Sequence, residues 1–152
     1  MNTQKNIEKV LSWYGSNDIE VDFASDPRID LLNRKVTIDM WQTNDEILFT
    51  ALHEAGHFIV NQDPDWKNKY PVRQEVRDGI TEGSDIFSEV ELLHEEYEAW
   101  EAGRRLGIEL GFGNLGESDS WIERKAQAIL SYVNFLSLKI QDMGEKVAVA
   151  AN

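Results

Sequence analysis

The chain has 152 residues, 41% of them hydrophobic and 28% charged, which suits one domain with a sizeable core. Its net charge of −13 disfavours nucleic acid and anionic membranes as partners, because both are recognised through basic patches. It contains no cysteine, which excludes disulfides, thiolate nucleophiles and thiolate metal ligands. No signal-peptide core and no run of roughly 18 apolar residues is present. We therefore expect a cytoplasmic protein in which residues 1–152 form a single domain.

A short helix and two strands are the first elements predicted along the chain. Residues 3–14 carry apolar side chains at helical spacing. Residues 19–23 alternate apolar and polar side chains, as a half-buried strand does, and Asp26-Pro27 marks a turn. Residues 34–40, RKVTIDM, alternate in the same way. We therefore expect a small sheet within residues 18–40, ahead of the next helix.

Residues 43–61, TNDEILFTALHEAGHFIVN, predict the best-defined helix of the chain. Thr43 and Glu46 have the spacing of a capping box, in which each side chain satisfies a backbone N–H at the start of the helix. Apolar residues cover most of the circumference, and a helix that is apolar nearly all round is buried. The polar side chains of this helix therefore lie inside the protein or at the floor of a cleft.

The same helix carries an H-E-x-x-H motif, His53-Glu54-Ala55-Gly56-His57. Residues four apart in a helix lie on one face, so His53 and His57 can bind one metal ion through their imidazoles. Glu54 is turned by roughly 100° from His53 and can reach a water molecule on that ion. A chance match is rare in a chain with only 3 histidines. A pair of hydrogen-bonded core histidines would leave Glu54 on a nearly all-apolar helix without a reason, although a buried charge is costly unless it is paired. The motif therefore predicts a metal site.

Two further helices are predicted after a loop. Residues 62–85 hold prolines and glycines with little periodicity, and form either a solvated connection or a substrate lid. Residues 88–110 and 120–141 have the apolar spacing of helices, and residues 143–152 are expected to be a flexible tail. Together the elements predict an α+β fold, with a small sheet packed on a mainly helical body around a central H-E-x-x-H helix.

A catalytic zinc site needs a third protein ligand, and three residues compete for this position. Glu96 stands in the middle of the apolar face of helix 88–110, where a carboxylate must be paired or bind a metal. A bend that exposes Glu96, or a salt bridge to a buried arginine, would also explain it. Asp63 has the spacing of the metzincin ligand, although Val60 replaces the glycine of that motif. His94 lies on the opposite, charged face of the helix, so Glu96 is favoured and both alternatives stay open.

Glycines recur every four residues on the same face as Glu96, at Gly103, Gly107 and Gly111. Each interior glycine costs a helix about 1 kcal/mol relative to alanine. Either another helix approaches this stripe closely, the best choice being helix 43–61, or the helix frays near Gly107.

The chain resembles the zincin metallopeptidases of the gluzincin kind in two segments. The first is His53-Glu54-Ala55-Gly56-His57, and the second, Glu96-Tyr97-Glu98-Ala99-Trp100, is similar to the E-x-x-A segment of small ImmA/IrrE-type peptidases. The order of strand, H-E-x-x-H helix and glutamate-bearing helix also fits, over roughly residues 18–110. The resemblance implies a minimal zincin-like domain that hydrolyses peptide bonds in a peptide or protein substrate.

The resemblance also implies a mechanism. Zn²⁺ would be held by His53, His57 and Glu96, would lower the pKa of its water and would polarise the scissile carbonyl. Glu54 would be the general base, passing the proton of the water to the leaving amine. A further donor for the transition state is expected, with Tyr70 or Tyr97 as candidates.

Zincins often bind their peptide along an edge strand, so we expect one edge of strand 34–40 to be open beside the metal. Two other functions remain possible on this sequence. One is a catalytically silent zincin-fold binding or regulatory protein, against which the intact Glu54 argues. The other is a metal hydrolase that acts on a bond other than a peptide.

Overall fold

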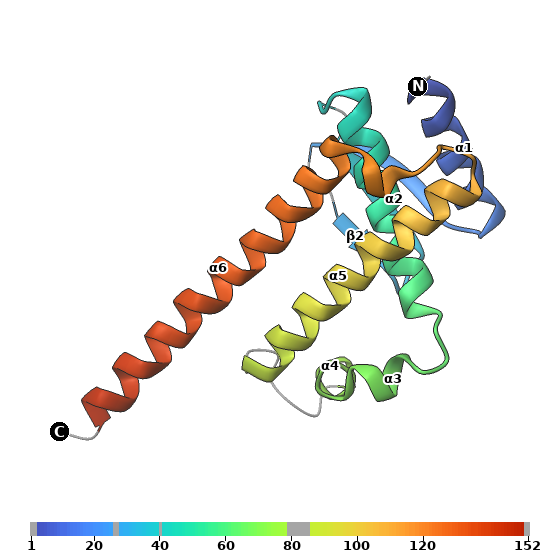
Figure 1. Ribbon diagram of the computed structural model, residues 1–152. Helices are drawn as coiled ribbons and strands as arrows, with labels where there is room; N and C mark the ends of the chain where they lie inside the picture. The colour runs from blue at the N-terminus through green and yellow to red at the C-terminus, as the bar shows by residue number, and fades with distance from the viewer. Residues whose placement is uncertain (1–2, 26–27, 40, 79–85, 151–152) are drawn as a thin grey trace.

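The computed structural model describes residues 3–25, 28–39, 41–78 and 86–150 (Figure 1). Its elements are α1 (Thr3–Ser16), β1 (Glu20–Ala24), β2 (Arg28–Asp30), β3 (Lys35–Asp39), α2 (Asn44–Asn61), α3 (Trp66–Lys69), α4 (Pro71–Arg77), α5 (Ile86–Glu109), the 3-10 helix η1 (Leu115–Glu117) and α6 (Asp119–Ala150). A small mixed sheet is combined with a mainly helical body, which confirms the α+β prediction. Within these residues, no helix is both long and apolar enough to cross a bilayer.

The sheet has the strand order β1-β3-β2, so β3 is its central strand. β1 runs parallel to β3 along its whole length, whereas β2 is antiparallel and pairs Arg28 with Thr37 and Asp30 with Lys35. The prediction of an open edge on strand 34–40 is therefore wrong. β2 was not predicted from the sequence; it is a three-residue strand that returns through a short turn and covers that edge.

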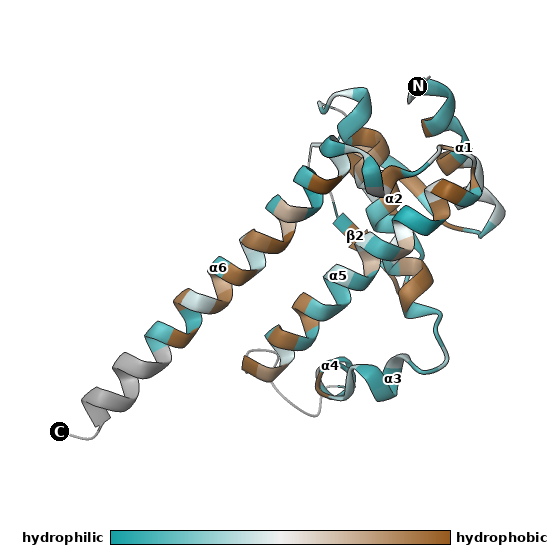
Figure 2. Cartoon of the chain, viewed as in Figure 1, coloured by the Kyte–Doolittle hydropathy of each residue, from teal (hydrophilic) through white to brown (hydrophobic). Residues whose placement is uncertain are grey.

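Helix α2 is the centre of the molecule. The predicted capping box is present, because the Thr43 side chain accepts from the Glu46 N–H while the Glu46 side chain accepts from the Thr43 N–H. α2 packs against α1, α5 and β3. Figure 2 shows apolar residues on this helix, and most of them are buried. The burial expected from its nearly continuous apolar surface is confirmed.

Helices α2 and α5 cross at backbone contact, and glycines make this possible. A Cβ at Gly103 of α5 would overlap the carbonyl oxygen of Leu52, and a Cβ at Gly56 of α2 would overlap that of Ala99. The predicted close approach of helix 43–61 to the glycine stripe is therefore confirmed. The crossing brings the turn of α2 that carries the histidines directly against the turn of α5 that carries Glu96.

The connection between α2 and α5 is more ordered than the predicted loop 62–85. It contains α3 and α4, which are short helices that carry few apolar residues and so escape a periodicity criterion. The Glu91 carboxylate accepts hydrogen bonds from the backbone N–H groups of Val72 and Arg73, at 3.3 and 2.8 Å. A side chain of α5 therefore caps the first turn of α4. Residues 79–85 of the predicted loop lie outside the described residues.

Helix α6 is longer than predicted. It runs to Ala150, so the expected end near Gln141 is wrong, although the flexibility expected of residues 143–152 stays a prediction. α6 packs against α5 and then extends away from the body, and Figure 2 shows that apolar residues recur along it. The predicted turn at Asp26-Pro27 and the last residue of the predicted strand, Met40, lie outside the described residues.

Candidate metal centre

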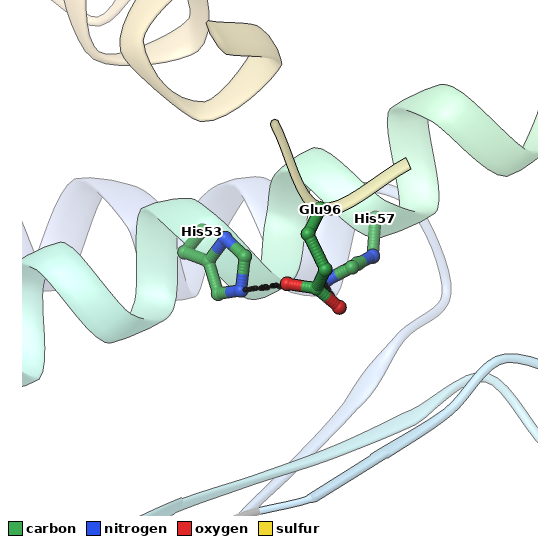
Figure 3. A group of neighbouring side chains, drawn as sticks. All are labelled: His53, His57 and Glu96. Atoms are coloured by element: carbon green, nitrogen blue, oxygen red, sulfur yellow. Dashed lines mark hydrogen bonds and ion pairs between the residues drawn. The ribbon is translucent and has the colours of Figure 1, made fainter. Parts of the chain in front are cut away.

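Two helices bring together His53, His57 and Glu96, the three residues predicted as metal ligands. Figure 3 shows the imidazoles of α2 and the carboxylate of α5 converging on one point. The two Nε2 atoms are 3.2 Å apart. His53 Nε2 lies 3.3 Å from Glu96 Oε2, and His57 Nε2 lies 3.4 Å from Glu96 Oε1. One ligand atom from each residue lies within 4.8 Å of the others, so the group could hold a metal ion.

These separations fit the chemistry of a small divalent cation. Zinc binds imidazole nitrogen at about 2.0–2.1 Å and carboxylate oxygen at about 2.0–2.2 Å. Ligands at these distances in a tetrahedron are roughly 3.3–3.5 Å apart. The two Nε2 atoms are 3.2 Å apart, close to this spacing, and each of them lies 3.3–3.4 Å from a different oxygen of the Glu96 carboxylate.

The protein environment favours charge on Glu96. Burial alone would raise the pKa of its carboxyl, but hydrogen bonds with His53 and His57 and the charges of both imidazoles outweigh burial. The pKa of Glu96 therefore lies well below its ordinary value. Burial lowers the pKa of His57, yet Glu96, Glu54 and Glu95 together raise it above its ordinary value. A metal cation bound here would take the place of the proton that Glu96, Glu54 and Glu95 favour on His57.

Glu54 has a different environment from Glu96, although both lie close to the histidines. Burial raises the pKa of its carboxyl, the charges of His53 and His57 oppose this, and the charge of Glu96 adds to it, so the net shift is upward. Its side chain forms no hydrogen bond or ion pair with any residue that the structure describes. The structure thus holds a carboxylate with a raised proton affinity beside the ligand group and free to accept a proton.

The ring of His53 is oriented by stacking. The indole of Trp100 lies nearly parallel to it, with centroids 4.4 Å apart and an interplanar angle of 20°. Trp100 in turn meets Trp121 edge to face at 5.0 Å. The Nδ1 atom of His53 is buried and has no hydrogen-bond partner among the described residues. At metal sites a hydrogen bond to the second ring nitrogen often orients the imidazole. Here stacking on Trp100 orients the His53 ring instead.

Tyr132 of α6 is a site residue that the sequence analysis missed. Burial and the charges of Glu96 and Glu54 raise the pKa of its hydroxyl above the ordinary value, and the charge of Arg73 opposes this only in part. A phenol therefore lies against the ligand group from a third helix. The available signal was weak: Tyr132 lies four residues before Leu136, a buried residue of α6, and so shares its face.

The other candidates lie elsewhere. Asp63 pairs with Lys69 at 2.8 Å, and the exposed His94 lies 3.8 Å from Glu98. Neither belongs to the group of potential ligands found among the described residues. Of the two tyrosines proposed as donors, Tyr70 donates its hydroxyl to Glu98 at 2.9 Å. The other, Tyr97, is 48% exposed and its ring lies under Lys125.

Comparison of the chain with protein-family models, with curated proteins and with solved structures gives no match. The function is therefore argued from the geometry of the metal centre and its surroundings.

Proposed function

We propose that the protein is a zinc-dependent peptidase of the zincin type, in which His53, His57 and Glu96 hold the metal. The observation that carries this proposal is the convergence of the two Nε2 atoms of the H-E-x-x-H helix and the Glu96 carboxylate of α5, with one ligand atom of each residue within 4.8 Å of the others. Cysteine is absent from the chain, so a site of nitrogen and oxygen donors is the kind it can build. Zn²⁺ is the ion that such a group of two imidazoles and one carboxylate most often binds at catalytic sites.

The bound metal would supply Lewis acidity, lowering the pKa of water and polarising the scissile carbonyl. Glu54 is the general base in this proposal. Its carboxylate lies beside the ligands and has no hydrogen-bond or ion-pair partner among the described residues. Its raised pKa makes it a better proton acceptor, which suits proton transfer from the attacking water to the leaving amine. It takes the proton of the attacking water and delivers it to the leaving amine.

Tyr132 is the proposed donor to the oxygen of the carbonyl under attack. Its hydroxyl is protonated at neutral pH, because burial and the neighbouring carboxylates raise its pKa. It reaches the ligand group from α6, whereas Glu54 reaches it from α2. A hydrogen bond from Tyr132 would stabilise the negative charge that develops on the carbonyl oxygen.

The test of the function uses purified protein loaded with zinc and a mixture of denatured-protein and peptide substrates. We expect cleavage that stops on chelation and returns on addition of zinc. Glu54→Gln should keep one zinc per chain and lose about 10²- to 10⁴-fold in cleavage rate, as expected for loss of a general base. Glu75→Gln, at an exposed carboxylate of α4, is the matched control and should cleave like the wild type.

Three outcomes separate the alternatives. Cleavage that survives Glu54→Gln would remove Glu54 from the mechanism. Zinc binding without cleavage of any substrate would indicate a silent binding or regulatory protein. Zinc-dependent hydrolysis of esters or other amides, with none of peptides, would indicate a different metal hydrolase.

A further inference from the structure

A cavity of 730 Å³ lies between the β2 side of the sheet and helices α4 and α5. Its lining holds four cationic side chains, those of Arg28, Lys35, Arg73 and Arg77, against two acidic ones. This composition is unusual for the chain, whose net charge is −13. The cavity is therefore a local cationic site on an acidic protein.

The cationic groups differ in how far they are already neutralised. Arg73 pairs with the buried Glu95 at 2.9 Å. Lys35 pairs with Glu20 at 3.0 Å and with Asp22 at 2.6 Å. The charges of Arg73 and Lys35 are therefore already paired with carboxylates, and these two side chains form part of the cavity wall.

Arg28 and Arg77 form no ion pair with any residue in the described part of the chain, although the charge of Arg28 acts on Asp30, which also lines the cavity. The guanidinium of Arg77 lies 4.7 Å from the centre of the Trp66 ring, and Trp66 is buried, so the stack holds the cation at the wall. Arg28 lies on β2, an edge strand of the sheet, and Ile29 to Leu32 continue the lining from there. Two guanidinium groups thus face the cavity with hydrogen-bond donors to spare.

The cavity and the candidate metal centre both include residues of helix α5. Glu95 of the cavity wall directly precedes Glu96 in α5, and its charge acts on His57. Arg73, the ion-pair partner of Glu95, acts electrostatically on Tyr132 of α6. A peptide at the metal centre could therefore place a neighbouring group in this cavity.

We propose that this cavity binds a carboxylate of the peptide substrate through Arg28 and Arg77, which makes peptides that present a carboxylate near the cleaved bond the substrate class. The inference rests on the proposed peptidase function. A guanidinium binds a carboxylate through two parallel hydrogen bonds, so it distinguishes the acid from its amide. The carboxylate can come from an Asp or Glu side chain or from the C-terminus of the peptide.

The test measures binding to the zinc-loaded Glu54→Gln variant, so that cleavage does not interfere. The probes are rhodamine-labelled alanine octapeptides with one central Glu or Gln, each made with a free or an amidated C-terminus, at about 0.15 M salt to screen long-range attraction. We expect binding of the carboxylate form to be about tenfold to hundredfold tighter than that of its amide, by fluorescence anisotropy. The Glu/Gln pair and the acid/amide pair show which carboxylate is recognised.

Arg77→Gln and Arg28→Gln, each added to Glu54→Gln, should abolish most of this preference. Lys67→Gln removes an exposed cation of α3 outside the cavity lining and should keep it. Arg28 is exposed on a strand edge, so its variant remains informative if loss of the Arg77 stack unfolds the protein. Equal binding of all four peptides, or a preference that survives both arginine variants, would overturn the inference.

The inference and the proposed function fail in different ways. Wild-type cleavage of peptides without a preference for acidic groups would overturn the inference and leave the function standing. An arginine-dependent preference in a protein that cleaves no peptide would support the carboxylate site and overturn the peptidase function.

Discussion

Glu54 and Glu96 are two carboxylates near the same pair of imidazoles, and their pKa values are shifted in opposite directions. Burial dominates at Glu54 and raises its pKa. At Glu96 the hydrogen bonds with His53 and His57 outweigh burial and lower the pKa. When two acids in one site have pKa values shifted in opposite directions, they often have different chemical roles. Here the ionised Glu96 suits a metal ligand, and the more basic Glu54 suits proton transfer.

If His57 binds zinc as proposed, zinc affinity should depend on pH. The pKa of His57 is raised in the metal-free protein, and zinc binds the neutral imidazole, so a proton must leave when zinc binds. Zinc affinity should therefore fall as pH falls through the raised pKa, beginning above the ordinary value of 6.5. The fold stability of the metal-free protein changes with pH in the opposite direction to zinc affinity. Protonated His57 contributes stability below pH 6.5, and this contribution is lost as pH rises through the raised pKa of His57.

Competition titrations with a chromophoric chelator between pH 6 and 9 measure this dependence. His94→Gln, which changes an exposed histidine, should leave the profile unaltered. An affinity that does not change over this range would contradict the assignment of His57 as a ligand.

Tyr132→Phe removes one hydroxyl from the metal centre. If this hydroxyl stabilises the transition state, kcat should fall by about 10²- to 10³-fold while the zinc content stays at that of the wild type. Tyr97→Phe, at an exposed ring, should have little effect on kcat. A Tyr132→Phe enzyme with wild-type kcat would assign Tyr132 a packing role only.

At the scale of elements, the crossing of α2 and α5 fixes the distance between the histidines and Glu96. Gly103→Ala would push a methyl group into the backbone of α2 at Leu52, so the helices must separate. We expect the free energy of unfolding to fall by about 1–3 kcal/mol, the usual range for overpacking. Gly15→Ala in α1 is the matched control, because a Cβ there meets nothing within 4 Å.

Urea titrations of the metal-free variants measure this difference. Gly15→Ala should raise the free energy of unfolding by about 0.4–1 kcal/mol, through the lower entropy of the unfolded chain. A Gly103→Ala protein as stable as the wild type, with unchanged zinc affinity, would show that the crossing tolerates a wider separation.

At the scale of the whole molecule, metal binding should stabilise the fold, because the ligands come from helices far apart in sequence. A ligand at about 100 times its dissociation constant stabilises the folded state by about 2.7 kcal/mol. For a chain of this size that corresponds to a rise in melting temperature of about 5–11 °C. Calorimetry with excess zinc and with a chelator measures the shift.

The same measurement identifies the third ligand. Glu96→Ala should lose the zinc-dependent rise, whereas Asp63→Ala and His94→Ala should keep it, since both side chains pair with other residues at the surface. A full rise in Glu96→Ala, with loss in either of the others, would place the metal at a different group of ligands.

The sequence by itself determined the features that depend on local geometry. The capping box at Thr43 and the shared face of His53 and His57 follow from the regular helix, in which four residues make about one turn. The inward position of Glu96 and the close approach at Gly103 follow from helical periodicity and from the cost of an unpaired buried charge or an interior glycine. Each of these signals lies within one element, so a single sequence contains it.

Only the tertiary structure decided the features that join separate elements. β2 covers the strand that was expected to be open, Glu91 of α5 caps α4, and Tyr132 of α6 lies within the electrostatic influence of Glu96 in α5. The pairing of β2 depends on a turn only a few residues long, and the other two contacts depend on how the helices cross. Such contacts leave no periodic trace in the sequence, because their partners are fixed by packing in three dimensions and not by spacing along the chain.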